Sequence, residues 1–219
     1  SISGGEISQI KEIINGVDLI GACIGTVKLD KVNNGSDITP GNIIIGLEST
    51  GVHSNGLTLA RKALLGETPQ KQKIKVNDYN TTLGTTLGLE LLTPTKIYVS
   101  ELLQMMEEGI NIKAMAHITG GGFYNLHRVF SENIRFVLND LPEPLPIFQL
   151  IQEAGGISIA EMYKVFNMGV GMIIIVENSD DANRVMGIAR KHGTQARGIG
   201  YTEACNGKEV VIPKYNLTG

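Results

Sequence analysis

Tryptophan is absent from this chain of 219 residues, and aromatic residues make up only 5% of it. An excess of positive charge is also missing, since 19 lysines and arginines face 22 aspartates and glutamates, for a net charge of −3. Nucleic-acid binders usually carry a basic face with aromatic residues between the charges. We find no such cluster, so the composition argues against a nucleic-acid partner.

Cysteine is scarce as well. Cys23 and Cys205 lie far apart and lack the spacing of a metal site. They fit two inert buried thiols in a reducing cytosol better than a disulfide, so we expect a cytoplasmic protein. No apolar run is long enough to cross a membrane, and we recognise no signal peptide, so no membrane partner is expected.

An initiator methionine is missing, and the chain enters at Ser1 into what looks like mid-domain sequence. We therefore expect a fragment of a longer protein. The motifs of P-loop nucleotide hydrolases, serine hydrolases with a nucleophile elbow and HExxH zinc proteases are missing too. These three enzyme classes have no support.

From residue 42 onward, the sequence pattern predicts apolar strands that alternate with amphipathic helices. This order predicts an α/β (α+β-like) fold, with a mixed sheet covered by helices. The turn-rich segment 31–41 is the expected boundary between a domain ending near residue 35 and a second domain over residues 36–219. Strands are predicted at 19–29, 42–47, 111–118, 133–138, 172–176 and 195–201, with a hairpin turn at Asn206-Gly207 into 209–212. Helices are predicted at 57–65, from Thr93-Pro94 to Gly109, and at 147–154, 158–164 and 179–191.

The candidate working centre is the stretch Ala116-His117-Ile118-Thr119-Gly120-Gly121-Gly122. Glycines between a strand and a helix let the backbone approach a ligand closely, and the free N–H groups of the helix's first turn favour an anion. His117 and Thr119 add an imidazole and a hydroxyl. The alternative is a tight turn with glycines for packing and a histidine bonded in the interior, and the motif alone favours neither.

A second loop has the same plan. Residues 48–56 follow a strand, carry His53, Ser54 and Asn55, and precede a helix that Ser54 or Asn55 could cap. If both loops lie at the ends of neighbouring strands, they can face one crevice. His53 alone would more often be a structural histidine.

The opening Gly4-Gly5-Glu6 is a weaker candidate. Glu6 could bind Mg²⁺ or a nucleotide's ribose, or it could be an acid in the first turn of a helix.

Five blocks of the sequence occur in the same order as in a known family. They are Gly4-Gly5-Glu6, residues 46–56, Leu92 to Val99, Ala116 to Gly122, and Phe166-Asn167-Met168-Gly169-Val170-Gly171-Met172. This series resembles aminoimidazole ribonucleotide synthetase, also called phosphoribosylformylglycinamidine cyclo-ligase, over nearly the whole chain. Two blocks depart from the family: Ile7-Ser8-Gln9 replaces Thr-Ala-Glu, and Glu48-Ser49-Thr50 is a mild variant. The family's upstream acidic signature and its N-terminal lysine have no counterpart here.

The resemblance implies an ATP-binding, dimer-forming N-terminal domain, of which this chain holds the last strands, and a C-terminal α/β domain. The implied reaction is ring closure of formylglycinamidine ribonucleotide in purine biosynthesis: ATP phosphorylates the formamide oxygen, the amidine-side nitrogen attacks, and phosphate leaves. ATP and Mg²⁺ are the implied cofactors and a homodimer the implied assembly. His117 and His53 would be catalytic, with Thr119, Gly120, Gly121, Gly122, Ser54 and Asn55 on substrate or phosphate. Gly4, Gly5 and Glu6 would bind nucleotide, and Glu6 the metal.

Alternatives of two kinds stay open. One is a sister enzyme of the same architecture: formylglycinamidine ribonucleotide synthetase, selenophosphate synthetase, thiamine-monophosphate kinase or the hydrogenase-maturation dehydratase. The other is a non-catalytic module that binds a nucleotide. The chain alone is expected to be inactive.

Overall fold

The computed structural model describes residues 21–66 and 74–219. It divides the chain into two units, Ser1–Val32 and Asn33–Gly219. In the first unit, residues 21–28 are exposed without regular secondary structure, and a short 3-10 helix, η1 (Leu29–Lys31), follows. The strand predicted at 19–29 is therefore wrong over the residues described. An apolar run needs a neighbouring strand to pair with, and none pairs with this run in the part of the chain described.

The second unit contains one mixed sheet of seven strands in the order β4-β6-β1-β7-β5-β8-β9. The strands are β1 (Ile43–Glu48), β4 (Ile112–His117), β5 (Ile134–Val137), β6 (Val170–Val176), β7 (Ala196–Ala204), β8 (Lys208–Ile212) and β9 (Leu217–Thr218). Neighbours are antiparallel except β5 and β8, which run parallel. The predicted fold class is confirmed.

The sheet is buried on both faces. Every residue of β6 is buried, and its side chains alternate between two apolar clusters. Ile173 and Ile175 belong to the first cluster, and Ile174 and Val176 to the second. Burial on both faces explains why this strand is a continuous apolar run in the sequence.

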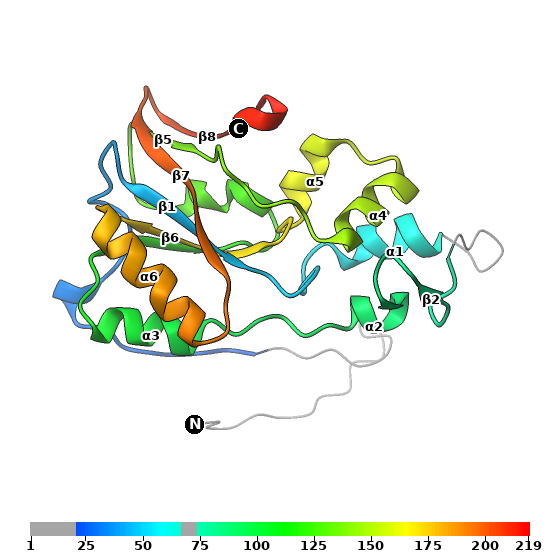
Figure 1. The fold of residues 1–219 in the computed structure, drawn as a ribbon. Coiled ribbons are helices and arrows are strands. Elements are labelled where there is room, and N and C mark those ends of the chain that lie inside the picture. The colour runs from blue at the N-terminus through cyan, green and yellow to red at the C-terminus, as the bar shows by residue number, and fades with distance from the viewer. Residues whose placement is uncertain (1–20, 67–73) are drawn as a thin grey trace, which may run out of the picture. The chain divides into compact units, whose positions relative to one another are not determined.

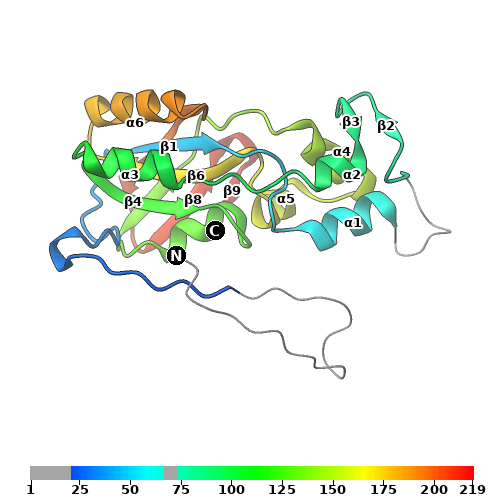
Figure 2. The ribbon, with the colours of Figure 1, turned by 90° about the horizontal axis from the view of Figure 1, so that it is seen from below.

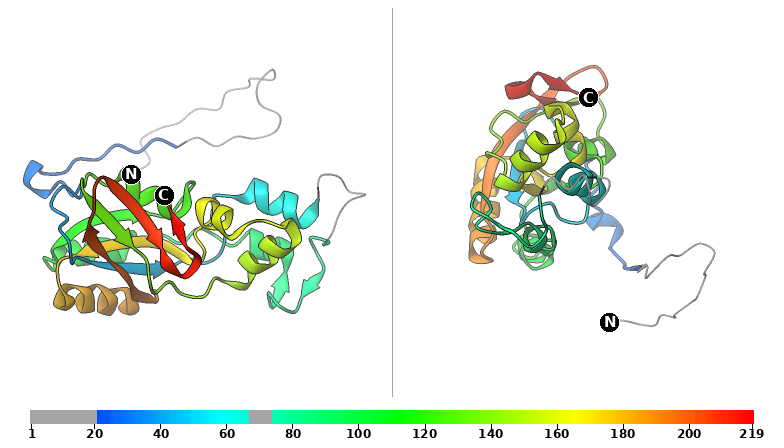
Figure 3. Two further views of the ribbon diagram at one scale, coloured as in Figure 1. Left: turned by 90° about the horizontal axis from the view of Figure 1, so that it is seen from above. Right: turned by 90° about the vertical axis from the view of Figure 1, so that its right-hand side faces the viewer.

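Helices cover both faces (Figures 1 and 2). The second cluster packs under α3 (Val99–Glu107) and α6 (Ser179–Lys191). The first cluster packs under the 3-10 helix η3 (Gly122–Arg128), α1 (Leu57–Leu65), α4 (Pro146–Gly155) and α5 (Ile159–Val165). Figure 3 shows α6 against the sheet, with α1, α4 and α5 beyond the ends of its central strands. The helices predicted at 57–65, 147–154, 158–164 and 179–191 are all present.

The helix predicted from Thr93-Pro94 starts later, at Val99. A separate helix, α2 (Leu87–Leu91), precedes it, and residues 93–98 between the two have no regular secondary structure. Hydrogen bonds to a distant loop hold this segment: the Thr50 hydroxyl donates to the Pro94 carbonyl over 2.8 Å, and the Tyr98 hydroxyl donates to the Glu48 carbonyl over 2.7 Å. Tertiary contacts here override a local start signal for a helix.

The hairpin predicted at Asn206-Gly207 is wrong, because β7 and β8 are not partners. Strand β5 lies between them, antiparallel to β7 and parallel to β8. A short hairpin, β2 (Tyr79–Asn80) with β3 (Thr85–Thr86), lies between α1 and α2 in the chain.

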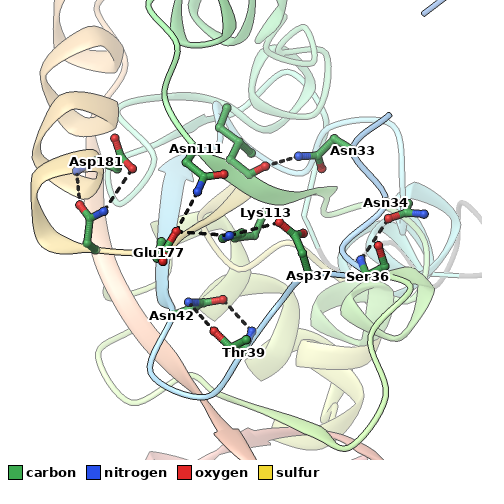
Figure 4. A network of polar contacts seen from close by, with 12 residues as sticks. Asn33, Asn34, Ser36, Asp37, Thr39, Asn42, Asn111, Lys113, Glu177 and Asp181 are labelled. Carbon is green, nitrogen blue, oxygen red and sulfur yellow. Dashed lines mark hydrogen bonds and ion pairs between the residues drawn. The ribbon is translucent and has the colours of Figure 1, made fainter. Parts of the chain in front are cut away.

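A polar network fixes the start of the second unit to the edge of the sheet (Figure 4). The Lys113 ammonium on β4 lies 3.1 Å from Asp37 and 3.3 Å from Glu177, and its side chain is only 12% exposed. The Asn33 amide donates to the Ile112 carbonyl. Residues 33–37 therefore run beside edge strand β4.

Cys23 and Cys205 are both free thiols in the structure. The expectation that they are buried is wrong, because Cys23 is exposed and Cys205 half-buried. Within the described ranges, no helix has the length and apolar character that crossing a bilayer requires.

Candidate functional site

The two histidine-bearing loops lie side by side at one end of the sheet. Strand β6 is antiparallel to both β1 and β4, and it brings Glu48 opposite Val170 and His117 opposite Met172. The Asn55 Oδ1 of the first loop lies 3.3 Å from the position that a Cβ on Gly120 of the second loop would take. The two loops lie close together as predicted, but they do not follow neighbouring strands, because β6 lies between β1 and β4.

His53 is held tightly in the first loop. It is 5% exposed and adopts a left-handed backbone conformation with φ of 61°. Its Nε2 accepts from the backbone N–H of Thr50 over 3.1 Å and of Lys96 over 3.4 Å. A nitrogen that accepts carries no proton, so the proton of the neutral ring is on Nδ1. That buried Nδ1 has no hydrogen-bond partner in the described part of the chain.

The electrostatics keep His53 neutral. Burial, followed by the nearby charges of His117 and Lys96, lowers the pKa of His53 to about 4. Burial also lowers the pKa of His117 below its usual value. Both imidazoles are therefore neutral at neutral pH and can each donate one hydrogen bond.

Ser54 and Asn55 do not cap the following helix, contrary to the prediction. The N-cap of α1 is Gly56, in a left-handed conformation with φ of 83° and without any side-chain cap. Ser54 is exposed and Asn55 half-buried. A Cβ at Gly56 would run into the Phe166 ring, so only glycine fits there.

The second loop leads into the 3-10 helix η3, which begins at Gly122, and not into an α-helix after the glycines. Gly122 packs against the Tyr163 carbonyl so closely that a Cβ would collide with it. Gly121 has φ of 107°, and its Cβ would lie 2.8 Å from Asn125 Oδ1. Packing and backbone conformation thus account for Gly121 and Gly122, whereas Gly120 is open except toward Asn55.

Two backbone donors of this loop are free. The Gly122 N–H donates to the Thr119 carbonyl over 2.9 Å, but no acceptor in the described residues faces the N–H of Gly120 or Gly121. The Thr119 hydroxyl accepts from Asn125 over 3.1 Å, which leaves its own proton to donate. Such a cluster of donors suits an anion.

A cavity of about 390 Å³ opens beside this loop along the edge of β4. Six polar side chains line it, together with Met115, Val129, Phe130 and two alanines. The polar ones are Asn33, Asn34, His117, Thr119, Asn125 and Arg128. His53, Ser54 and Asn55 stand next to the glycine loop but are not part of this lining.

Sequence reasoning missed Arg128, Asn125 and a role for the backbone of Lys96. The Arg128 guanidinium lies 3.4 Å from the Gly120 carbonyl. Neither Arg128 nor Lys96 has a carboxylate partner among the residues the structure describes. Together with the N–H and O–H donors, these two cations form a candidate anion site at this end of the sheet. The one feature of the sequence that could have indicated Arg128 is its short spacing from the three glycines.

The nucleotide and metal candidates Gly4, Gly5 and Glu6 lie outside the described residues. Over the ranges that are described, no three His, Cys, Asp or Glu side chains gather as a metal site would need.

Residues 39–213 match the family model of the AIR synthase related protein, C-terminal domain. This chain belongs to that family. The phosphoribosylformylglycinamidine cyclo-ligase of Methanococcus maripaludis (strain C7) is 42% identical over 99% of this chain and 61% of its own length. The enzyme of the same name from Methanocaldococcus jannaschii is 41% identical over 99% of this chain and 62% of its own. The chain thus spans about three fifths of these curated relatives.

Among solved structures, the hydrogenase maturation protein HypE is similar, with a TM-score of 0.53 over 85% of this chain and 53% of that one. The sequence identity is 16%, so this likeness shows the shared fold alone.

Proposed function

We propose that this chain is the C-terminal part of an ATP-dependent cyclo-ligase that closes the imidazole ring of aminoimidazole ribonucleotide. The observation that carries the proposal is the anion site beside His117, in a chain 42% identical to cyclo-ligases. The substrate, formylglycinamidine ribonucleotide, carries a phosphate, and the reaction releases phosphate and ADP. An anion site next to a neutral imidazole suits both the binding and the chemistry.

Each side chain has a proposed role. Arg128, the Thr119 hydroxyl and the N–H groups of Gly120 and Gly121 bind phosphate oxygens. His117, neutral at neutral pH, donates a hydrogen bond to the former amide oxygen as that oxygen leaves with the phosphate and gains negative charge. His53 is the second catalytic candidate through its free Nδ1–H. Ser54 and Asn55, which cap no helix, contact the substrate, and Gly122 shapes the loop.

The described residues suit the phosphates of ATP better than they suit Mg²⁺. The loop donors and Arg128 fit a phosphate chain, so ATP or the ribose phosphate could occupy this site. The described ranges supply no metal-binding cluster, so we route no step through Mg²⁺ and leave Glu6 as its proposed ligand. We also propose, on the resemblance alone, that the whole protein is a cytoplasmic homodimer.

A chimera tests the proposal. In the Methanococcus maripaludis relative, the stretch that aligns with this chain is replaced by residues 1–219, and turnover of formylglycinamidine ribonucleotide with ADP release is measured. We expect turnover, and we expect His117→Ala to lower it by about tenfold or more. His127→Ala is the matched control, because that exposed imidazole contacts the Gly219 carbonyl and the Tyr124 ring, does not line the cavity, and should leave turnover unchanged.

The same chimera separates the alternatives. Unchanged turnover in His117→Ala would remove that residue from the catalytic set. A folded chimera that binds phosphate without turning over substrate would favour a non-catalytic module. The 219 residues alone are expected to release no ADP.

A further inference from the structure

Tyr98 spans the end of the sheet between the two loops. Its hydroxyl donates to the Glu48 carbonyl, where β1 ends, and its ring meets the His117 imidazole edge-on at 6.0 Å between centroids and 72° between planes. Strand β6 lies between β1 and β4. The tyrosine therefore crosses over the start of β6 and links the ends of the two strands on either side.

Gly171 of β6 is the residue that the tyrosine crosses. A Cβ on Gly171 would collide with the Tyr98 hydroxyl and would come within 2.9 Å of His53 Cε1. Since only glycine lacks that atom, the crossing depends on Gly171. The irregular segment 93–98 brings Tyr98 to this place, because the bonds from Thr50 to Pro94 and from Lys96 to His53 hold the segment against the first loop.

Tyr98 is well suited to a fixed position. It is 3% exposed, and burial, with help from the Glu101 and Glu48 charges, raises the pKa of its hydroxyl, so the hydroxyl remains a donor. His117, by contrast, is more exposed and lines the cavity. A buried, anchored ring beside an exposed imidazole restricts the rotamers that the imidazole can adopt.

We propose that Tyr98 is a positioning residue whose ring orients the His117 imidazole toward the cavity. Gly171 leaves room for the tyrosine, and the Glu48 carbonyl anchors its hydroxyl. This inference rests on the proposed function for its catalytic consequence, but the geometry that it asserts can be tested without any turnover.

Nuclear magnetic resonance of the 219-residue chain provides the test, with histidine side chains labelled and titrated. In Tyr98→Leu we expect the His117 ring protons to lose the shift caused by the tyrosine ring. We also expect the His117 pKa to rise toward 6.5 as water enters. Tyr98→Phe keeps the ring and should retain most of both effects. The charged groups nearby, Lys96, Glu48 and Glu101, are unchanged in these variants.

Phe148→Leu is the matched control, since it removes another fully buried ring, from the other apolar cluster. It should leave the His117 signals and titration as they are. Identical His117 behaviour in wild type and Tyr98→Leu, or equal changes in Phe148→Leu, would overturn the proposal. Gly171→Ala should change the His117 shifts and titration in the same way as Tyr98→Leu. If Gly171→Ala fails to fold, the comparison of Tyr98→Leu with Tyr98→Phe still tests the proposal.

In the active chimera, Tyr98→Leu should lower kcat about tenfold with KM within about twofold, and Tyr98→Phe should restore most of the loss. Loss through KM alone would contradict positioning. An inactive chimera with the expected resonance changes would refute the cyclo-ligase assignment and leave the geometric proposal standing.

Discussion

The side-chain amide of Asn125 donates to the Thr119 hydroxyl and to the His117 carbonyl, both over 3.1 Å. One buried side chain, 4% exposed, thus ties the start of η3 to the end of β4. It also fixes the hydroxyl that we assign to phosphate binding. Asn125 is therefore part of the framework that holds the donors of the glycine loop in place.

Asn125→Ala should weaken both the fold and the site. Loss of two partly buried hydrogen bonds, with their partners left in place, should lower the free energy of unfolding by about 2 kcal/mol. Urea unfolding measures this loss, and titration with inorganic phosphate measures the weaker binding. Asn206 is an exposed asparagine, so Asn206→Ala should change neither quantity. An equally large effect of Asn206→Ala would contradict the claim that Asn125 holds the donors of the glycine loop.

Two glycines of the same loop should respond in opposite ways. Gly122→Ala forces a Cβ into the Tyr163 carbonyl at a φ of 56°, and should cost about 3 kcal/mol in urea unfolding. Gly120→Ala meets only Asn55 Oδ1 at 3.3 Å, so it should keep nearly full stability. If Gly120 is where an anion approaches the backbone, its variant should nevertheless bind phosphate about tenfold more weakly.

The two readouts together decide between packing and ligand contact. Normal phosphate binding by a stable Gly120→Ala protein would mean that all three glycines serve the turn, and the anion site would then rest on side chains only.

Local sequence patterns were sufficient for much of this fold. The apolar run of β6 and the Ser158 cap of α5, which accepts from the Glu161 N–H over 3.2 Å, depend on neighbours in the chain. The proximity of the His53 and His117 loops also followed from each having a strand before it. Such features need only the periodicity of apolar residues and the chemistry of helix ends.

The rest depends on contacts between distant segments. Residues 93–98 carry a helix start signal, yet bonds to Thr50, His53 and Glu48 hold them outside any helix. Strand β5 separates β7 from β8, which no turn sequence could reveal. Arg128 reaches the glycine loop because η3 is a tight 3-10 helix. Pairing order and side-chain reach are properties of the folded chain.

Arg128 should supply much of the affinity for phosphate. Arg128→Met removes an unpaired cation from the cavity while keeping a long stem, and should weaken binding of inorganic phosphate to the chain about tenfold at low salt. The wild-type affinity should fall with added salt more steeply than that of the variant. Arg61→Met, an exposed arginine on α1, is the control, and equal losses in both variants would indicate unspecific attraction.

Lys113 should stabilise the start of the second unit in a pH-dependent way. Burial lowers the pKa of its ammonium, but hydrogen bonds and charges of Asp37 and Glu177 outweigh burial and raise it. A raised lysine pKa stabilises the fold below the unfolded value near 10.4, and this contribution is lost as the pH rises through the folded pKa. Lys113→Met should therefore cost about 1 kcal/mol at pH 7.

The difference in unfolding free energy between wild type and Lys113→Met should narrow in urea unfolding as the pH rises past the unfolded value near 10.4 and through the raised folded pKa. The exposed Lys75 has no ion pair among the residues described, so Lys75→Met should show neither the loss at pH 7 nor the narrowing. A pH-independent difference for Lys113→Met would mean that packing of its stem, and not its charge, matters.

His53 should make the fold sensitive to acid. Its pKa of about 4 lies below the unfolded value of 6.5, because burial disfavours the charged ring. The unfolded chain therefore takes up the proton first, so the contribution of neutral His53 is complete above pH 6.5 and is lost as the pH falls toward 4. Between pH 7 and 4.5 this single group should remove about 2 kcal/mol from the free energy of unfolding.

His53→Gln should flatten this part of the profile of urea midpoints, since glutamine keeps an acceptor near the Thr50 N–H but does not titrate. His127→Gln changes an exposed imidazole and should leave the profile steep; a profile equally steep in His53→Gln would mean that His53 is not the neutral, buried ring on which the two-loop arrangement depends.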